Sequence, residues 1–69
     1  MMTKFIEVTT TGDYDVLINV NNILDVARKK GTNNAIITLS VSDNQEYYYI
    51  VPDYDSIINR IKILCGQSI

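Results

Sequence analysis

A short stretch in the second half of the chain decides its fold: Gln45-Glu46-Tyr47-Tyr48-Tyr49-Ile50-Val51-Pro52-Asp53-Tyr54. Three tyrosines followed by two β-branched residues favour an extended strand over residues 46–51. This strand must end at Pro52, which has no backbone N–H for a sheet ladder. Asp53 can then cap a helix that begins at Tyr54, because an aspartate side chain accepts hydrogen bonds from the free N–H groups of a first helical turn. The stretch therefore joins a strand directly to a helix.

The predicted helix carries one apolar stripe. Ile57, Ile58, Ile61 and Leu64 fall at the spacing that places them on one side of a helix. Gly66 then supplies a C-terminal stop, because glycine readily adopts the left-handed conformation that ends many helices. Such a stripe must pack against another apolar surface.

Four further strands are predicted before this stretch. Residues 4–10 and 14–20 alternate between apolar and polar positions around a turn at Thr11-Gly12-Asp13, and residues 35–41 form the clearest strand, closed by a turn at Ser42-Asp43-Asn44. A corner or a single helical turn is expected at Asn21-Asn22. Residues 23–30 suit either a short strand or a helical turn, and we favour the strand. The sequence thus predicts one α+β domain over residues 1–69, an antiparallel meander of about five short strands followed by one C-terminal helix packed on one sheet face.

The alternation assigns the strand residues to two faces. We expect the helix to cover a β-branched, apolar face formed by Ile6, Val8, Val16, Ile18, Val20, Ile37, Leu39 and Ile50. The opposite face then carries Phe5, Leu17, Ile36, Tyr47, Tyr49 and Val51. One helix covers only one side of a sheet, and a large uncovered apolar patch usually marks an interaction site. We therefore predict self-association through this second face, with a homodimer as the default. Internal filling by a curled, partly closed barrel and binding of a foreign protein are the alternatives.

Composition argues against several classes of function. The chain has 69 residues with one cysteine and no histidine, so it offers neither an internal disulfide nor a zinc ligand set. The commonest general base is missing as well, and we expect no catalytic, cofactor or metal site. The acidic pairs Asp13 with Asp15 and Asp53 with Asp55 suit a turn and a helix start better than a cation site. No segment has the pattern of a secretory signal or a membrane span, which predicts a cytoplasmic protein.

A basic run offers an alternative function. Arg28, Lys29 and Lys30 could hold phosphates while Tyr47 and Tyr49 stack on the bases of a single-stranded nucleic acid. The formal net charge of −2 gives no global attraction to nucleic acid. Three basic residues at a hairpin tip are also typical of a solvated loop. We therefore treat nucleic acid as an unlikely partner.

Several local patterns resemble the small FlbD/SwrD-type proteins encoded among bacterial flagellar genes. The similar features are the turn at Thr11-Gly12, the Asn corner in residues 18–23, the Ile-Thr-Leu strand at residues 36–39 and the passage from Ile50-Val51 into a single C-terminal helix. The resemblance implies a bacterial accessory protein tied to motility, without a catalytic site. Together these observations predict a small, non-enzymatic, cytosolic interaction protein that self-associates. The alternatives are a single-stranded nucleic-acid-binding module and a phage-type regulatory or inhibitor module.

Overall fold

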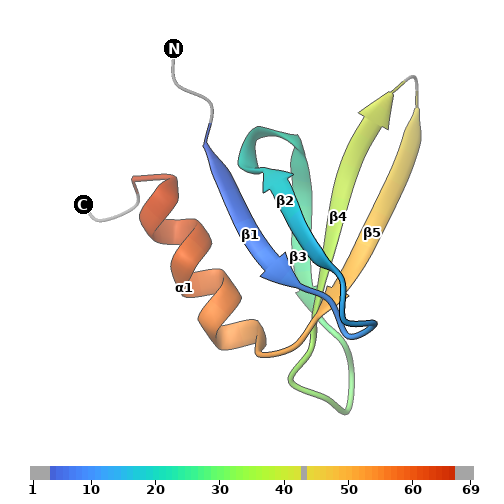
Figure 1. The fold of residues 1–69 in the computed structure, drawn as a ribbon, viewed down its shortest axis with the longest axis vertical. Coiled ribbons are helices and arrows are strands. Elements are labelled where there is room, and N and C mark those ends of the chain that lie inside the picture. The colour runs from blue at the N-terminus through green and yellow to red at the C-terminus, as the bar shows by residue number, and fades with distance from the viewer. Residues whose placement is uncertain (1–3, 43, 67–69) are drawn as a thin grey trace.

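A computed structural model describes residues 4–42 and 44–66, and over these residues it confirms the predicted α+β class (Figure 1). In chain order the elements are β1 (Phe5–Thr9), β2 (Asp15–Asn19), the 3₁₀ turn η1 (Val20–Asn22), β3 (Ile23–Arg28), β4 (Ala35–Ser42), β5 (Gln45–Val51) and α1 (Tyr54–Leu64). Residues 23–28 form a strand, as favoured above, and the predicted corner at Asn21-Asn22 is the 3₁₀ turn. In its first turn the Asn19 side chain accepts a hydrogen bond from the Asn21 N–H at 2.9 Å.

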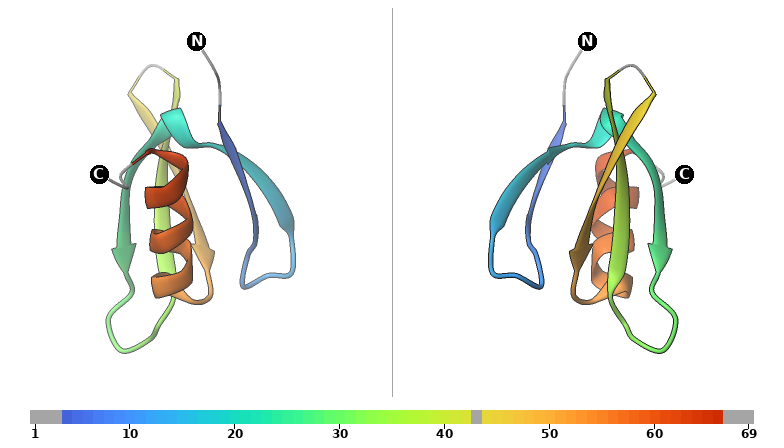
Figure 2. Two further views of the ribbon diagram at one scale, coloured as in Figure 1. Left: turned by 90° about the vertical axis from the view of Figure 1, so that its left-hand side faces the viewer. Right: turned by 90° about the vertical axis from the view of Figure 1, so that its right-hand side faces the viewer.

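The described strands form two separate antiparallel sheets. One sheet is the hairpin β1-β2, and the other is the meander β3-β4-β5. The 3₁₀ turn carries the chain from the first sheet to the second, and Figure 2 shows the hairpin standing apart from the three-stranded sheet. The sequence predicted the strands but not this division.

The C-terminal helix begins at the predicted cap. The Asp53 carboxylate accepts a hydrogen bond from the Ser56 N–H at 3.3 Å, and the Tyr54 N–H donates to the carbonyl of Asn33 in the β3–β4 loop at 2.6 Å. Asp53 itself has a left-handed backbone with φ of 69°, a conformation that aspartate adopts more readily than most residues. The helix start is therefore held by its own cap and by a neighbouring loop.

The helix bridges the two sheets. It contacts β3 of the three-stranded sheet. Toward the hairpin, Arg60 Nη2 donates to the carbonyl of Glu7 at 2.8 Å, and Lys4 Nζ donates to the carbonyl of Leu64 at 2.6 Å. The helix thus joins β1 and β3, and it leaves the opposite strand edges, those of β2 and β5, without such a cover.

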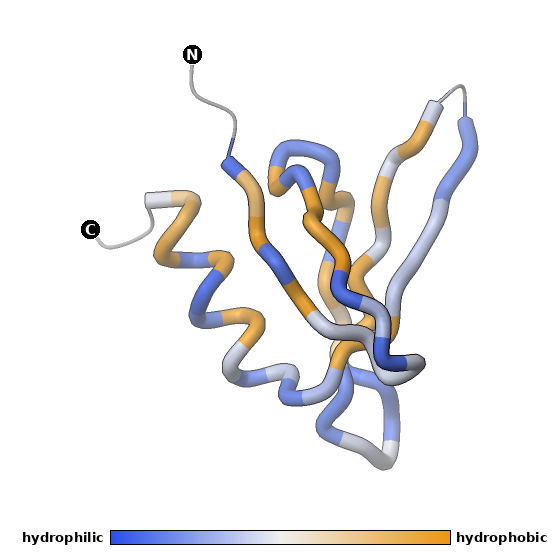
Figure 3. Tube along the Cα trace, viewed as in Figure 1, coloured by the Kyte–Doolittle hydropathy of each residue, from blue (hydrophilic) through white to orange (hydrophobic). Residues whose placement is uncertain are grey.

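The core lies where the hairpin, the three-stranded sheet and the helix meet. Apolar segments recur along β1, β2, β4 and α1 in Figure 3. The buried apolar residues are Ile6, Val8, Ile18, Val20, Ala35, Ile37, Val51 and Ile57. Most of the predicted covered face is therefore correct, and the partly buried Val16 and Leu39 pack against it. The predicted helical stripe also holds at Ile57, Ile61 and Leu64.

The predicted facing of β5 is wrong. Tyr49 pairs with Ile37 and Val51 pairs with Ala35, so both point toward the core, because directly paired residues share a face. Val51 is only 3% exposed. Ile50 pairs with Ile36 and lies on the opposite face, which the helix does not cover. Both parities of this strand are apolar or aromatic, so alternation alone does not define which parity faces inward, and a shift of one residue exchanges the faces.

Candidate functional site

The first candidate surface is the side of the three-stranded sheet that faces away from the core. We call it the outer face and define it by Ala27, Ile36, Thr38, Tyr48 and Ile50. Strand pairing brings these side chains together, since Ile36 lies between Ala27 and Ile50, and Thr38 pairs with Tyr48. Tyr48 is 61% exposed, and Ile36, Thr38 and Ile50 are half-buried. A shallow hollow of about 580 Å³ runs over this face. The outer face is therefore an apolar and aromatic surface open to solvent.

Opposite charges border the outer face. Lys29 follows β3 and lies beside the end of the sheet where Arg28 pairs with Ala35, and Glu46 on β5 pairs with Ser40 toward the other end. β3 and β5 are the two edge strands of this sheet. The cation and this carboxylate thus occupy diagonally opposite corners of the outer face, and the exposed Asp25, which pairs with Thr38, adds a second carboxylate at its β3 edge.

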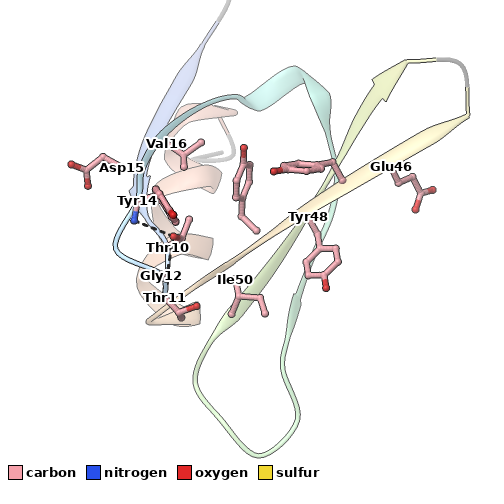
Figure 4. Close-up of a pocket in the computed structure, with 11 residues that line it drawn as sticks. Thr10, Thr11, Gly12, Tyr14, Asp15, Val16, Glu46, Tyr48 and Ile50 are labelled. Atoms are coloured by element: carbon pink, nitrogen blue, oxygen red, sulfur yellow. Dashed lines mark hydrogen bonds between the residues drawn. The ribbon is translucent and has the colours of Figure 1, made fainter.

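The second candidate surface is a groove between the hairpin and the three-stranded sheet, which we call the β2–β5 groove. One part of it, with a volume of about 790 Å³, extends from the Thr10–Gly12 turn along β5 (Figure 4). The other part, of about 480 Å³, continues toward Phe5, Leu17 and Val41. Both parts are lined by Val16, Tyr47 and Tyr49. The groove therefore runs between β2 and β5, which belong to different sheets and do not pair with each other.

Two tyrosines form the aromatic centre of the groove. The rings of Tyr47 and Tyr49 meet edge to face, with their centroids 5.0 Å apart and an interplanar angle of 82°. Such T-shaped contacts are favourable because the positive edge of one ring meets the negative face of the other. Burial raises the pKa of the Tyr49 hydroxyl above its ordinary value of 10.0, and the neighbouring Tyr47 hydroxyl adds to this shift. The Tyr49 hydroxyl therefore stays neutral at physiological pH.

The structure divides the six residues of the predicted self-association face among three places. Four of them, Phe5, Leu17, Tyr47 and Tyr49, line the β2–β5 groove. Ile36 lies on the outer face, and Val51 is buried in the core. The prediction of one continuous face is therefore wrong, because the strands form two sheets and β5 presents its other parity to solvent. The residues that the prediction missed are Tyr48 and Ile50.

The predicted nucleic-acid constellation is also divided. The Arg28 guanidinium donates to Asn33 Oδ1 at 2.6 Å, meets the Asp55 carboxylate at 3.1 Å and lies 4.5 Å from the centre of the Tyr54 ring. It thereby belongs to the helix start. Lys29 borders the outer face, and Lys30 is exposed in the loop that follows. The structure thus places Arg28 away from the tyrosine pair of the groove.

Three further features of the described residues concern metal binding, the single cysteine and membrane insertion. Within residues 4–42 and 44–66, no three His, Cys, Asp or Glu side chains gather closely enough to hold a metal ion. The Cys65 thiol is exposed. No helix among the same residues is long and apolar enough to cross a membrane. Comparison with protein-family models, curated proteins and solved structures gives no match for this chain.

Proposed function

We propose that this protein is a non-enzymatic interaction protein that self-associates through the outer face of its three-stranded sheet. The observation that carries the proposal is the cluster of Ile36, Tyr48 and Ile50 on a face that no element covers within the described residues. The buried Ile57 anchors the helix in the core on the other side of the sheet. The proposed contact therefore uses a different set of residues from the self-association face predicted from the sequence, and shares only Ile36 with it.

Protein size favours covering this face. A chain of 69 residues buries a smaller fraction of its surface than larger domains do, and small domains commonly gain stability from partner subunits. Isoleucine supplies apolar area, and tyrosine buries a large ring while its hydroxyl stays at the polar rim of an interface. A second copy of the same face provides a partner of matching chemistry.

The charges at the corners of the outer face suit a two-fold dimer. In an isologous contact, each residue meets the symmetry-related surface of the partner. A two-fold axis that exchanges the corners of the sheet would bring Lys29 of one copy next to Glu46 of the other. This arrangement would place the apolar residues at the centre and an opposite-charge pair at two edges, and rim charges of this kind orient partners more than they add affinity.

Sedimentation velocity of matched tyrosine variants tests the proposal. Tyr48→Lys places a charge on the outer face beside Thr38 and should raise the dimer dissociation constant by at least about tenfold, because a buried unpaired charge is costly. The control is Tyr14→Lys, which changes an exposed tyrosine in the hairpin turn and should leave dimerisation unchanged. A wild-type protein that sediments only as a monomer, or equal weakening by the two substitutions, would overturn the proposal.

The broader role we propose is that of a cytosolic accessory protein. The resemblance to the FlbD/SwrD-type proteins supports a bacterial, non-catalytic role. The alternative, binding of single-stranded nucleic acid, is less well supported, because Arg28 lies at the helix start whereas Tyr47 and Tyr49 lie in the β2–β5 groove. Salt-sensitive binding of a labelled single strand that disappears when Lys29 and Lys30 are replaced would restore it.

A further inference from the structure

The two sheets present free strand edges along the β2–β5 groove. β2 is an edge of the hairpin and β5 is an edge of the three-stranded sheet, and neither outer edge is paired along its length with a strand of the described chain. One backbone hydrogen bond closes the groove at its lower end, from the Thr11 N–H to the Ile50 carbonyl at 2.9 Å. Exposed strand edges are templates for a further strand, because their N–H and C=O groups lack partners.

The register of each sheet identifies the backbone groups that point into the groove. In the hairpin, the Thr10 N–H donates to the Tyr14 carbonyl and the Val20 N–H donates to the Lys4 carbonyl. Alternate residues of an antiparallel strand bond to opposite sides, so the even-numbered residues of β2 face β1, and the backbone groups of Asp15 and Leu17 face outward.

The same reasoning applies to β5. The Ile50 carbonyl receives the Thr11 N–H, so Ile50 directs its backbone away from β4. With a period of two residues, the N–H and C=O groups of Tyr48 and Glu46 point outward as well. Unpaired donors and acceptors therefore line both sides of the groove at the spacing of a β-ladder.

The side chains around the groove define the chemistry of an added strand. Its inward residues would meet Val16, Tyr47 and Tyr49, which requires apolar side chains. Its outward residues would lie between Asp15 on one side and Glu46 on the other, and Figure 4 shows these two carboxylates on opposite sides of the view, one from the hairpin and one from β5. The residues that line the groove include no lysine or arginine. Opposite charges on neighbouring strands attract, so the outward residues should be basic.

We infer that the β2–β5 groove binds an extended segment of a partner protein as an additional strand, with apolar residues facing inward and basic residues facing outward. Main-chain hydrogen bonds to β2 and β5 supply affinity, and the alternating side chains supply specificity. The groove and the outer face share strand β5, where Glu46, Tyr48 and Ile50 border both. The groove itself is complete within one copy of the chain, so a monomeric protein would still bind the segment.

Titration of the ¹⁵N-labelled full chain with synthetic peptides tests this inference. The probe is an acetylated, amidated octapeptide of alternating valine and lysine, and the matched control replaces every lysine by glutamate. We expect the lysine peptide to slow hydrogen exchange at the amides of Leu17 and Tyr48 by at least about tenfold, because these N–H groups gain ladder partners. Tyr47→Ser should weaken binding, whereas Ile63→Ser on the exposed side of the helix should not.

Three results would overturn the inference. Equal binding of the glutamate peptide would contradict the charge argument. Chemical-shift changes centred on Ile36 and Thr38 would place the peptide on the outer face instead. Strong protection of the Leu17 and Tyr48 amides without peptide would show that β2 and β5 pair with each other directly.

Discussion

Replacement of Ile57 by alanine should weaken the packing of the helix against the core. Ile57 is 3% exposed and is the helix residue that belongs to the buried core. Ile57→Ala removes three carbon atoms, and about 0.8 kcal/mol per buried carbon gives about 2.4 kcal/mol. The cavity that remains adds to this transfer cost. We therefore expect a loss of about 3 kcal/mol in the free energy of unfolding.

This loss is large for a domain of 69 residues, whose total stability is expected to be about 3 to 10 kcal/mol. Urea denaturation followed by circular dichroism measures it, with Ile63→Ala as the matched control. Ile63 is 66% exposed on the same helix, and its truncation should cost less than about 0.5 kcal/mol. If Ile57→Ala does not fold, Ile57→Val should still lose about 1 kcal/mol. Equal effects of Ile57→Ala and Ile63→Ala would refute the docking of the helix on the core.

Three further predictions concern single side chains. Asp53→Ala should lower the free energy of unfolding by about 1 to 2 kcal/mol in the same denaturation assay. The substitution removes the carboxylate that accepts the Ser56 N–H, and it puts alanine at a positive φ. Asp53→Asn should be nearly neutral, because asparagine can also cap the helix and adopt a positive φ. Asp55→Asn should cost less than about 1 kcal/mol, because both partners of its ion pair with Arg28 are exposed, and a larger loss would mean that the pair is better shielded than the structure indicates. The raised pKa of Tyr49 favours its neutral form in the folded state. The free energy of unfolding of the wild type, relative to that of Tyr49→Phe, should therefore fall as the pH rises above 10.0. A difference in stability between the two proteins that stays constant across that range would contradict the shift.

Local signals in the sequence predict most of the elements. Pro52 and Asp53 mark the passage from the last strand to the helix, and the structure ends β5 at Val51 and begins α1 at Tyr54. The asparagine pair at residues 21 and 22 likewise indicates the 3₁₀ turn. These features depend on the chemistry of a few neighbouring residues, such as a missing N–H or a side chain that bonds the nearby backbone, and they can be recognised without knowledge of the tertiary structure.

The facing of β5 could not be obtained in the same way. Alternation predicts facing only when one parity is polar, and in the run from Tyr47 to Val51 both parities are apolar or aromatic. The deciding factor is the register with β4, which pairs Val51 with the fully buried Ala35. Register is a tertiary property. Because the register of β5 was not predicted, Tyr48 and Ile50 were not included among the predicted interface residues.

The division into two sheets could not be predicted from the sequence either. Hairpin pairing of β1 with β2 and meander pairing of β3, β4 and β5 follow from short connections, but the contact between β2 and β5 depends on residues far apart in the chain. Among the described residues, one backbone hydrogen bond joins the hairpin to β5, from the Thr11 N–H in the β1–β2 turn to the Ile50 carbonyl. Phe5, Leu17 and Tyr47 are exposed and Tyr49 is half-buried, and these four residues line a groove and not the flat face that the sequence predicts.

In the proposed dimer, two copies of the chain meet through their outer faces. An isotope-filtered nuclear Overhauser measurement on a mixture of labelled and unlabelled protein tests it most directly, because it detects only contacts between copies. We predict cross-peaks between the methyl groups of Ile36 and Ile50 in one copy and the ring of Tyr48 in the other. A sample at millimolar concentration that gives no cross-peaks between copies, or cross-peaks only from Phe5, Leu17 and Tyr47, would contradict the claim.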